Sequence, residues 1–158
     1  MFLMRWNVNH IANEAVQDTC IVVYPSGRYH MEKSAQGSHE KLKLHTFEDT
    51  LQAADLEQLE GLLNEPKLKS STHRNLAEGK IFREGEMTTL DVPREGHVQQ
   101  LSFANYFGIP GWVSNVNAGT DPEERIVTPL RKWLDSHIKA KNEAALQNAV
   151  PTRCIPQQ

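Results

Sequence analysis

A β-hairpin is predicted between residues 20 and 33, and it sets the type of sheet that this chain forms. The run 20–24, CIVVY, is β-branched and aromatic, and Pro25, Ser26 and Gly27 supply the chemistry of a tight turn. Tyr29 and Met31 then alternate with charged residues, which indicates a second strand. Because strands joined by a short turn lie antiparallel, the segment favours an antiparallel sheet.

Further strands are predicted from the same kind of alternation. Leu42 and Leu44 alternate with the polar residues of 41–45, which predicts a third strand with one face in water. Three more strands are predicted at 80–83, 86–92 and 97–103. Residues 93–96 form the turn between the last two, and the pattern leaves open whether Val92 pairs with His97 or with Val98.

The first of two predicted helices begins after Leu51. With Gln52 at the N-cap, Leu51 and Leu56 can form a hydrophobic staple, and Asp55 lies in the first turn, where the helix dipole favours an anion. An apolar stripe of leucines continues to residue 63, and Pro66 ends the helix. The following residues 67–74 are predicted to be a basic connector.

The second helix is predicted from residue 128 to about residue 147. The hydroxyl of Thr128 caps its start, and Pro129 occupies the first helical position, where its missing N–H costs nothing. One face of this helix is apolar. That face consists of Leu130, Trp133, Leu134, Ile138 and Ala145.

These elements predict an α+β fold, with an antiparallel sheet of about five or six strands and two main helices packed on one face. A chain of 158 residues is long enough to bury a sizeable core without a metal or a disulfide. No repeat or composition break divides it, so residues 1–158 are predicted to form a single domain. Residues 1–17 show no clear period and are interpreted as a loosely ordered arm, and 149–158 as a tail.

The charge and hydropathy of the chain exclude some classes of partner. Lys and Arg number 17 against 20 Asp and Glu, a formal net charge of −3, which argues against nucleic acid as a partner. The longest apolar run has five residues, so no membrane span is predicted. Arg5 interrupts the apolar start, so no export signal is predicted and a cytoplasmic location is expected, unless the true start lies upstream.

The two cysteines, Cys20 and Cys154, leave two states open. Two independent reduced thiols are the favoured interpretation, since free cysteine is a common small buried hydrophobe. The alternative is a disulfide that closes almost the whole chain, which loop-closure entropy values at roughly 4 to 5 kcal/mol. Inside an apolar strand, Cys20 is not expected to be a catalytic thiolate.

No metal site and no cofactor are predicted. The nearest approach to a metal cluster consists of His30, Glu32, His39 and His45. Antiparallel pairing of strands 28–33 and 38–46 would place Glu32 near His39 and His30 near Lys41. Lysines among the ligands repel a cation, so an ordinary solvated strand face is favoured.

No catalytic residue is predicted either, because the sequence holds no nucleophile motif, no CxxC pair and no glycine-rich phosphate loop. A local positive stretch could hold a phosphate or an acidic partner, although a solvated connector is the favoured interpretation. That stretch consists of Lys67, Lys69, His73, Arg74, Lys80 and Arg83.

The better candidate for binding is the segment 106–113, in which large apolar groups stand among glycine and proline. Tyr106, Phe107, Ile109 and Trp112 are the candidate binding residues, since exposed aromatic groups often anchor a protein partner. The competing interpretation is that these side chains fold back and cover one end of the core.

Several of these segments resemble short uncharacterised bacterial proteins, many of them exported. The resemblance is carried by 21–29, by the staple-started helix 51–63, by 129–134 and by the terminal Cys154. It implies a fold and carries no catalytic motif.

The sequence therefore favours a non-enzymatic binding or protein-interaction domain, which uses the sheet surface and segment 106–113. The alternative is a hydrolase-like enzyme whose site is assembled from distant groups. Its candidates are His30, His45 and His97 with nearby carboxylates.

Overall fold

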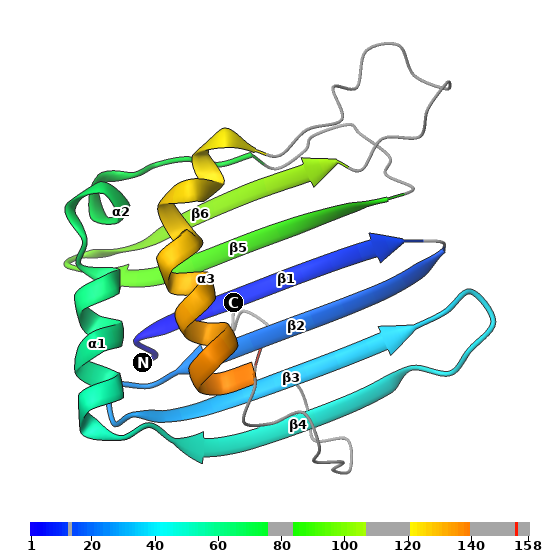
Figure 1. Ribbon diagram of the computed structural model, residues 1–158, viewed down its shortest axis with the longest axis horizontal. Coiled ribbons are helices and arrows are strands. Elements are labelled where there is room, and N and C mark those ends of the chain that lie inside the picture. The colour runs from blue at the N-terminus through cyan, green and yellow to red at the C-terminus, as the bar shows by residue number, and fades with distance from the viewer. Residues whose placement is uncertain (13, 76–83, 107–120, 140–153, 155–158) are drawn as a thin grey trace.

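The fold is α+β, and its centre is one six-stranded antiparallel sheet with the strand order β4-β3-β2-β1-β5-β6 (Figure 1). The structure is a computed structural model, and it describes residues 1–12, 14–75, 84–106, 121–139 and 154. The strands are β1 Met4–Ala12, β2 Ala15–Val23, β3 Arg28–Gln36, β4 Lys43–Thr50, β5 Gly85–Arg94 and β6 His97–Tyr106. The helical segments are α1 Ala53–Leu63, α2 Pro66–Ser70, η1 Pro122–Val127, α3 Thr128–Leu134 and η2 Asp135–Lys139.

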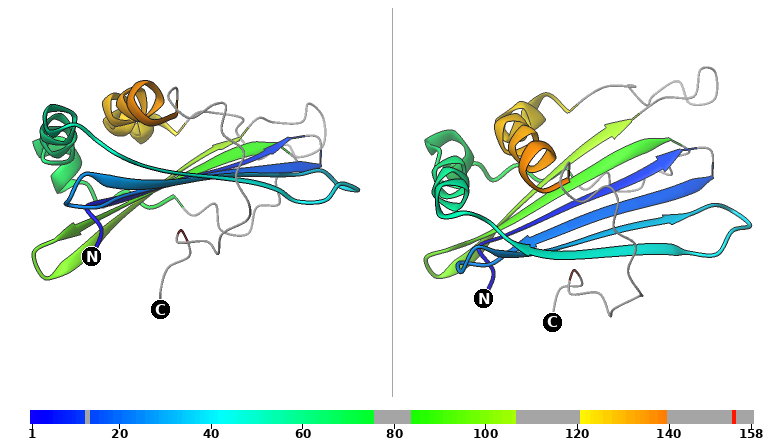
Figure 2. Two further views of the ribbon diagram at one scale, coloured as in Figure 1. Left: turned by 90° about the horizontal axis from the view of Figure 1, so that it is seen from below. Right: turned by 60° about the horizontal axis from the view of Figure 1, so that its bottom comes forward.

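The sheet has two chemically different faces. Figure 2 shows α1 and α3 on the same side of the sheet, and we call that side the helix face. Buried apolar side chains of the strands and helices form one core there, including Trp6, Ile21, Leu90 and Leu134. Because side chains alternate along a strand, their neighbours point to the opposite side, which we call the far face.

The N-terminal residues form a central strand, so the prediction of a loose arm over 1–17 is wrong. Strand β1 pairs with β2 on one side and with β5 on the other. Met4 and Trp6 are fully buried on the helix face. Asn7 and Asn9 of β1 lie on the far face, where Asn9 donates to the carboxylate of Asp18 at 2.6 Å.

Strand pairing also differs from prediction around β4 and in the β5–β6 hairpin. Residues 37–42 connect β3 to β4, which moves the register so that Glu32 faces Thr46 instead of His39. In the hairpin, Val92 pairs with Gln99 rather than with either predicted partner. The physical reason is a two-residue turn at 95–96, in which Gly96 adopts a φ of 78° that favours glycine.

The first predicted helix is confirmed, with Gln52 at its N-cap and Leu59 and Leu63 buried. Residues 67–74 were predicted to be a connector, and this is wrong for the first part of the segment. Pro66 follows α1 and begins a second short helix, α2. It occupies the first turn of that helix, where a missing N–H costs nothing, and Leu68 is buried beneath it.

The C-terminal helical segment begins earlier than predicted, since η1 precedes α3. Asp121 caps it by accepting a hydrogen bond from the backbone N–H of Glu123, and Pro122 follows the cap. Thr128 therefore lies inside a continuous helical segment instead of capping its start. Leu130, Trp133, Leu134 and Ile138 are buried as predicted, and 140–147 lie outside the described residues.

A helix that spans a membrane must be both long enough and sufficiently apolar. None of the helices within the described residues meets both requirements.

Candidate functional site

A hollow of about 280 Å³ lies between the end of α2 and the outer edge of β6. We call it the edge hollow. It is lined by Lys69, Ser70, Ser71, Thr72, Arg74, His97, Val98, Gln99 and Gln100. Two basic side chains and one histidine face it, and none of these lining residues is acidic. The edge hollow is therefore suited to a ligand that carries negative charge.

Arg74 links the edge hollow to a second hollow of about 190 Å³, which it lines together with Thr89, Asp91 and Gln100. Arg74 is exposed, and within the described part of the chain its guanidinium forms no hydrogen bond or ion pair. The carboxylate of Asp91 is instead bound by Arg5. Arg74 is thus the cation that is available to a ligand at both hollows.

The backbone of β6 is partly open beside Arg74. The backbone N–H of Ser102 donates to the carbonyl of His73 at 3.1 Å, and its backbone carbonyl accepts from the N–H of Asn75 at 3.0 Å. The backbone groups of Ser102 therefore point away from β5. In an antiparallel strand alternate residues point the same way, and the groups of Val98 and Gln100 therefore also point outward. Among the described residues, these outward groups have no backbone partner.

A buried polar network holds Arg74 in place, because both of its sequence neighbours bind Asp121. His73 Nε2 and Asn75 Nδ2 lie 2.8 and 3.1 Å from Asp121 Oδ2. The backbone N–H of Asp121 donates to Asn105 Oδ1 at 2.7 Å. The segment that carries Arg74 is therefore fastened both to the end of β6 and to the start of η1.

Asp121 is expected to give the protein a component of acid sensitivity. Burial acts to raise the pKa of Asp121, but the hydrogen bonds from His73, Asn75 and the Glu123 backbone outweigh it, so the pKa lies below its usual value. A lowered pKa contributes stability that is present above the unfolded value of about 3.9 and is lost as the pH falls through the folded value.

We therefore expect Asp121→Asn to lower the free energy of unfolding by about 1 to 3 kcal/mol at pH 7, since it removes charge-assisted hydrogen bonds. The difference from the wild type should shrink below about pH 4. Urea unfolding at several pH values measures both effects. A difference that stays constant down to the acid limit would show that the charge of Asp121 is not the cause.

Gln99 shapes the wall of the edge hollow. Its side chain is buried, and its Nε2 lies 2.8 Å from the carbonyl oxygens of both Leu68 and Ser71. The Leu68 carbonyl also accepts a hydrogen bond from the backbone N–H of Ser71 at 3.2 Å, and the Gln99 amide gives both carbonyls at the end of α2 a donor from β6. The end of α2 is thereby fixed beside β6.

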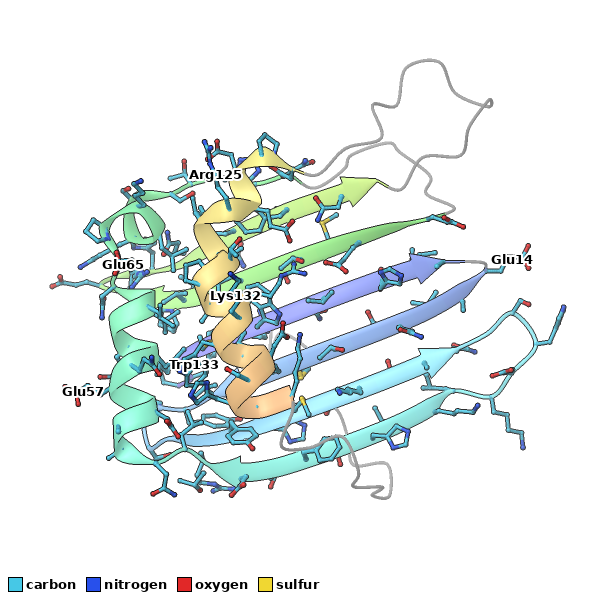
Figure 3. The ribbon with its side chains drawn as sticks, viewed as in Figure 1. Glu14, Glu57, Glu65, Arg125, Lys132 and Trp133 are labelled. Carbon is cyan, nitrogen blue, oxygen red and sulfur yellow. A yellow bond between two sulfur atoms is a disulfide. The ribbon has the colours of Figure 1, made fainter. Side chains whose placement is uncertain are left out.

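A second cluster lies on the far face, where Cys20 and Cys154 are joined by a disulfide with a Cα–Cα distance of 6.1 Å. The structure has the bridged state, so the favoured interpretation of two independent reduced thiols is wrong. Figure 3 shows the disulfide in yellow beside β2 and β3. Cys20 faces Glu32 across the strands, and this position brings Cys154 next to the side chains of β3.

His30 occupies the centre of this group. Its Nε2 lies 2.7 Å from Glu32 Oε1 and its Nδ1 lies 3.0 Å from Glu48 Oε1. His30 and Glu32 are buried, whereas Glu48 is exposed. We call Cys20, Cys154, His30, Glu32 and Glu48 the cysteine cluster.

The structure does not bring together the histidines of the enzymatic alternative. His30 lies on the far face of β3, whereas His45 pairs with Lys33 and points to the helix face. His97 lies at the start of β6, an edge strand that is four positions from β3 in the sheet order. His39 is exposed in the connection between β3 and β4.

The candidate binding residues are covered only in part. Tyr106 is the last residue of β6 and pairs with Gly85. Phe107, Ile109 and Trp112 lie outside the described residues, as do Lys80 and Arg83. The aromatic segment therefore stays a prediction.

Sequence reasoning noticed most of these residues separately but did not assemble them. The pair His30 and Glu32 was recognisable from its i, i+2 spacing, which places both side chains on one face of a strand. The proximity of Glu48 and Cys154 depends on strand register and on the disulfide. Gln99 and Asp121 carry no local signal, since a polar side chain is recognised as buried only from its tertiary contacts.

Comparison with models of known protein families gave no match for this chain, and comparison with curated proteins gave none either.

Proposed function

We propose that this protein is a non-enzymatic binding domain that recognises an extended, acidic segment of a partner protein at the edge hollow. The observation that carries the proposal is the combination of an exposed Arg74 with the outward backbone groups of Val98 and Gln100, none of which has a partner among the described residues. A carboxylate can bind the guanidinium while the partner's backbone pairs with the edge of β6.

The charge of the site supports an acidic partner. Lys69 and Arg74 line the edge hollow on the side of α2, and His97 lines it on the side of β6. Around these side chains the chain as a whole is acidic, with a net charge of −3. A local positive surface on an acidic protein favours acidic segments over polyanions such as nucleic acid, which are repelled elsewhere on the molecule.

The surface of β6 supports recognition of an extended backbone. An edge strand presents a row of N–H and C=O groups that a further strand can bind. Val98 is one of the large apolar side chains that remain exposed, at 47% of its full area, and it lies within the edge hollow. It offers apolar contact to a partner strand next to the basic side chains.

The aromatic segment 106–113 remains part of the proposed surface. Its first residue, Tyr106, ends β6, and 107–113 come next in the sequence. Phe107 and Trp112 are the proposed anchors, and their replacement by Ala is expected to weaken binding without changing the charge of the edge hollow.

The proposal predicts binding that depends on both backbone and charge. A displayed library of random short peptides selected on the protein should yield peptides that contain Asp or Glu.

Gln100→Pro removes one outward backbone N–H and should weaken binding of a selected peptide about tenfold. Arg74→Gln removes a charge-assisted hydrogen bond and should weaken it tenfold or more, with a smaller dependence on salt. Titration calorimetry measures both.

Lys43→Gln provides the matched control, because it removes an exposed cation from β4, the other edge strand. It should leave binding unchanged. Thermal unfolding of each variant shows whether it is folded. If no peptide is selected, or if folded Gln100→Pro and Arg74→Gln proteins bind like the wild type, the proposal is wrong.

A further inference from the structure

We propose that reduction of the Cys20–Cys154 disulfide creates a binding site for a divalent transition-metal ion, with Zn²⁺ as the ion that its donors suit best. The proposed ligands are the two thiolates, the imidazole of His30 and the carboxylate of Glu32. This site lies on the far face, apart from the edge hollow, and does not depend on the function proposed above.

The ligand atoms already lie close together. One donor atom each from His30, Glu32 and Cys154 falls within 4.8 Å of the other two, and Cys20 is bonded to Cys154. A tetrahedral zinc site has ligand bonds of about 2.0 to 2.3 Å, so its ligands lie roughly 3 to 4 Å from one another. His30, Glu32 and Cys154 therefore need only small displacements, and Cys20, which is bonded to Cys154, joins them when the two sulfurs separate on reduction.

The strands hold these donors on one face. Cys20 and Glu32 are direct cross-strand partners in β2 and β3, and His30 precedes Glu32 by two residues. Side chains at such positions point to the same side of a sheet, and cross-strand partners are about 5 Å apart. The sheet thus positions three of the four ligands. The fourth ligand is Cys154, near the C-terminus.

The orientation of His30 is that of a metal-binding histidine. Its Nε2 points toward Glu32, while its Nδ1 lies 3.0 Å from Glu48 on β4. Histidine ligands characteristically donate their second ring N–H to a carboxylate, which fixes the tautomer and raises the basicity of the coordinating nitrogen. Glu48 is therefore proposed as the positioning residue of the site.

The disulfide controls whether the site can form, because a disulfide sulfur is a poor ligand and a thiolate a strong one. A dithiol reductant donates two electrons and two protons to the disulfide and is itself oxidised to a cyclic disulfide. Cys20 and Cys154 are left as thiols. Binding of the ion then releases both thiol protons to solvent. The two thiolates and the carboxylate carry three negative charges, which attract the divalent ion, and the imidazole of His30 completes the four ligands.

Lys41, which the predicted pairing placed near His30, lies outside this cluster, and so does Lys33. Lys41 precedes β4, and Lys33 points to the helix face because it pairs with His45. The objection that lysines among the ligands repel a metal ion therefore does not apply to the pairing that forms. Arg28 is exposed, and its guanidinium lies 3.8 Å from the positioning carboxylate of Glu48.

Titration with Co²⁺ tests the proposal, because Co²⁺ occupies thiolate sites and its absorption spectrum reports sulfur ligation. The protein reduced by a dithiol, with the excess reductant removed under anaerobic conditions, should bind one Co²⁺ per chain with a thiolate-to-metal charge-transfer band. Zn²⁺ should displace it. The oxidised protein should show no such band.

Variants distinguish a site with all four ligands from metal binding by the two thiolates alone. In the reduced protein, Glu48→Gln should weaken binding about 10- to 100-fold. His30→Gln and Glu32→Gln should weaken it at least as much, and C20S/C154S should abolish the band. His39→Gln is the matched control, since this exposed histidine lies outside the cluster, and it should bind like the wild type.

Circular dichroism covers the case in which reduction unfolds the chain. If the reduced protein has lost its β-sheet signal, the metal ion should restore it, and the same addition to C20S/C154S should not. The proposal is overturned if the reduced wild type shows no charge-transfer band. It is equally overturned if His30→Gln and Glu48→Gln proteins bind Co²⁺ as tightly as the wild type.

Discussion

Loss of the Cys20–Cys154 disulfide is expected to lower the free energy of unfolding by up to about 5 kcal/mol. The two residues are separated by 134 positions, so the bond closes nearly the whole chain and restricts the unfolded state strongly. Domains of this kind are stable by only about 5 to 15 kcal/mol in total, so the effect is a large fraction of the whole. Urea unfolding of C20S/C154S against the oxidised wild type measures it.

Two controls show whether the cross-link itself is responsible. The wild type treated with a dithiol, in buffer that contains a chelator, should unfold at the same urea concentration as C20S/C154S. The double variant should be insensitive to the dithiol. A difference of less than about 1 kcal/mol between oxidised and reduced wild type would contradict the loop-closure argument, because a loop of this length predicts several times that amount.

Trp6→Ala is expected to destabilise the protein by about 3 to 5 kcal/mol. Trp6 is fully buried at the centre of the sheet, where its cross-strand partners are Ile21 in β2 and Leu90 in β5. The guanidinium of Arg131 from α3 lies 5.5 Å from its ring centroid. Truncation therefore removes contacts to two strands and to α3 at once. Thermal and urea unfolding measure the loss.

Trp6→Phe is the matched control for that variant. It keeps an aromatic face below Arg131 and removes only the second ring, whose buried Nε1 has no hydrogen-bond partner among the described residues. We expect it to cost less than half as much as the alanine substitution, because no satisfied polar group is lost. If Trp6→Ala were as stable as the wild type, residues 4–12 would be the loose arm that the sequence indicated.

Local patterns were sufficient for most of the strands and for the first helix. The β-branched run of β2, the turn at 25–27 and the staple of α1 act through contacts between near neighbours in the chain, so they can be recognised in a short window. The same approach failed for β1, because Asn7 and Asn9 have low strand propensity by themselves. Their place on the far face is determined by strands β2 and β5.

The two candidate sites depend on non-local contacts. The edge hollow forms because α2 ends beside β6 and because Asp121, from a segment 46 positions later, holds Asn75 in place. Its basic residues had been noticed as a positive stretch, but their pairing with an open strand edge could not be. Val98 had no significance until the register placed its backbone groups on the outer side of β6.

By itself, the sequence determined the α+β class, the antiparallel sheet and the buried faces of α1 and α3. These features follow from periodicities of two and of about 3.6 residues, which operate over a few positions of the chain. Only the tertiary structure decided that the first strand is central, that Cys20 meets Cys154, and that His30 lies between two carboxylates. Those outcomes depend on strand register and on contacts between distant segments, and register is a property of the whole sheet.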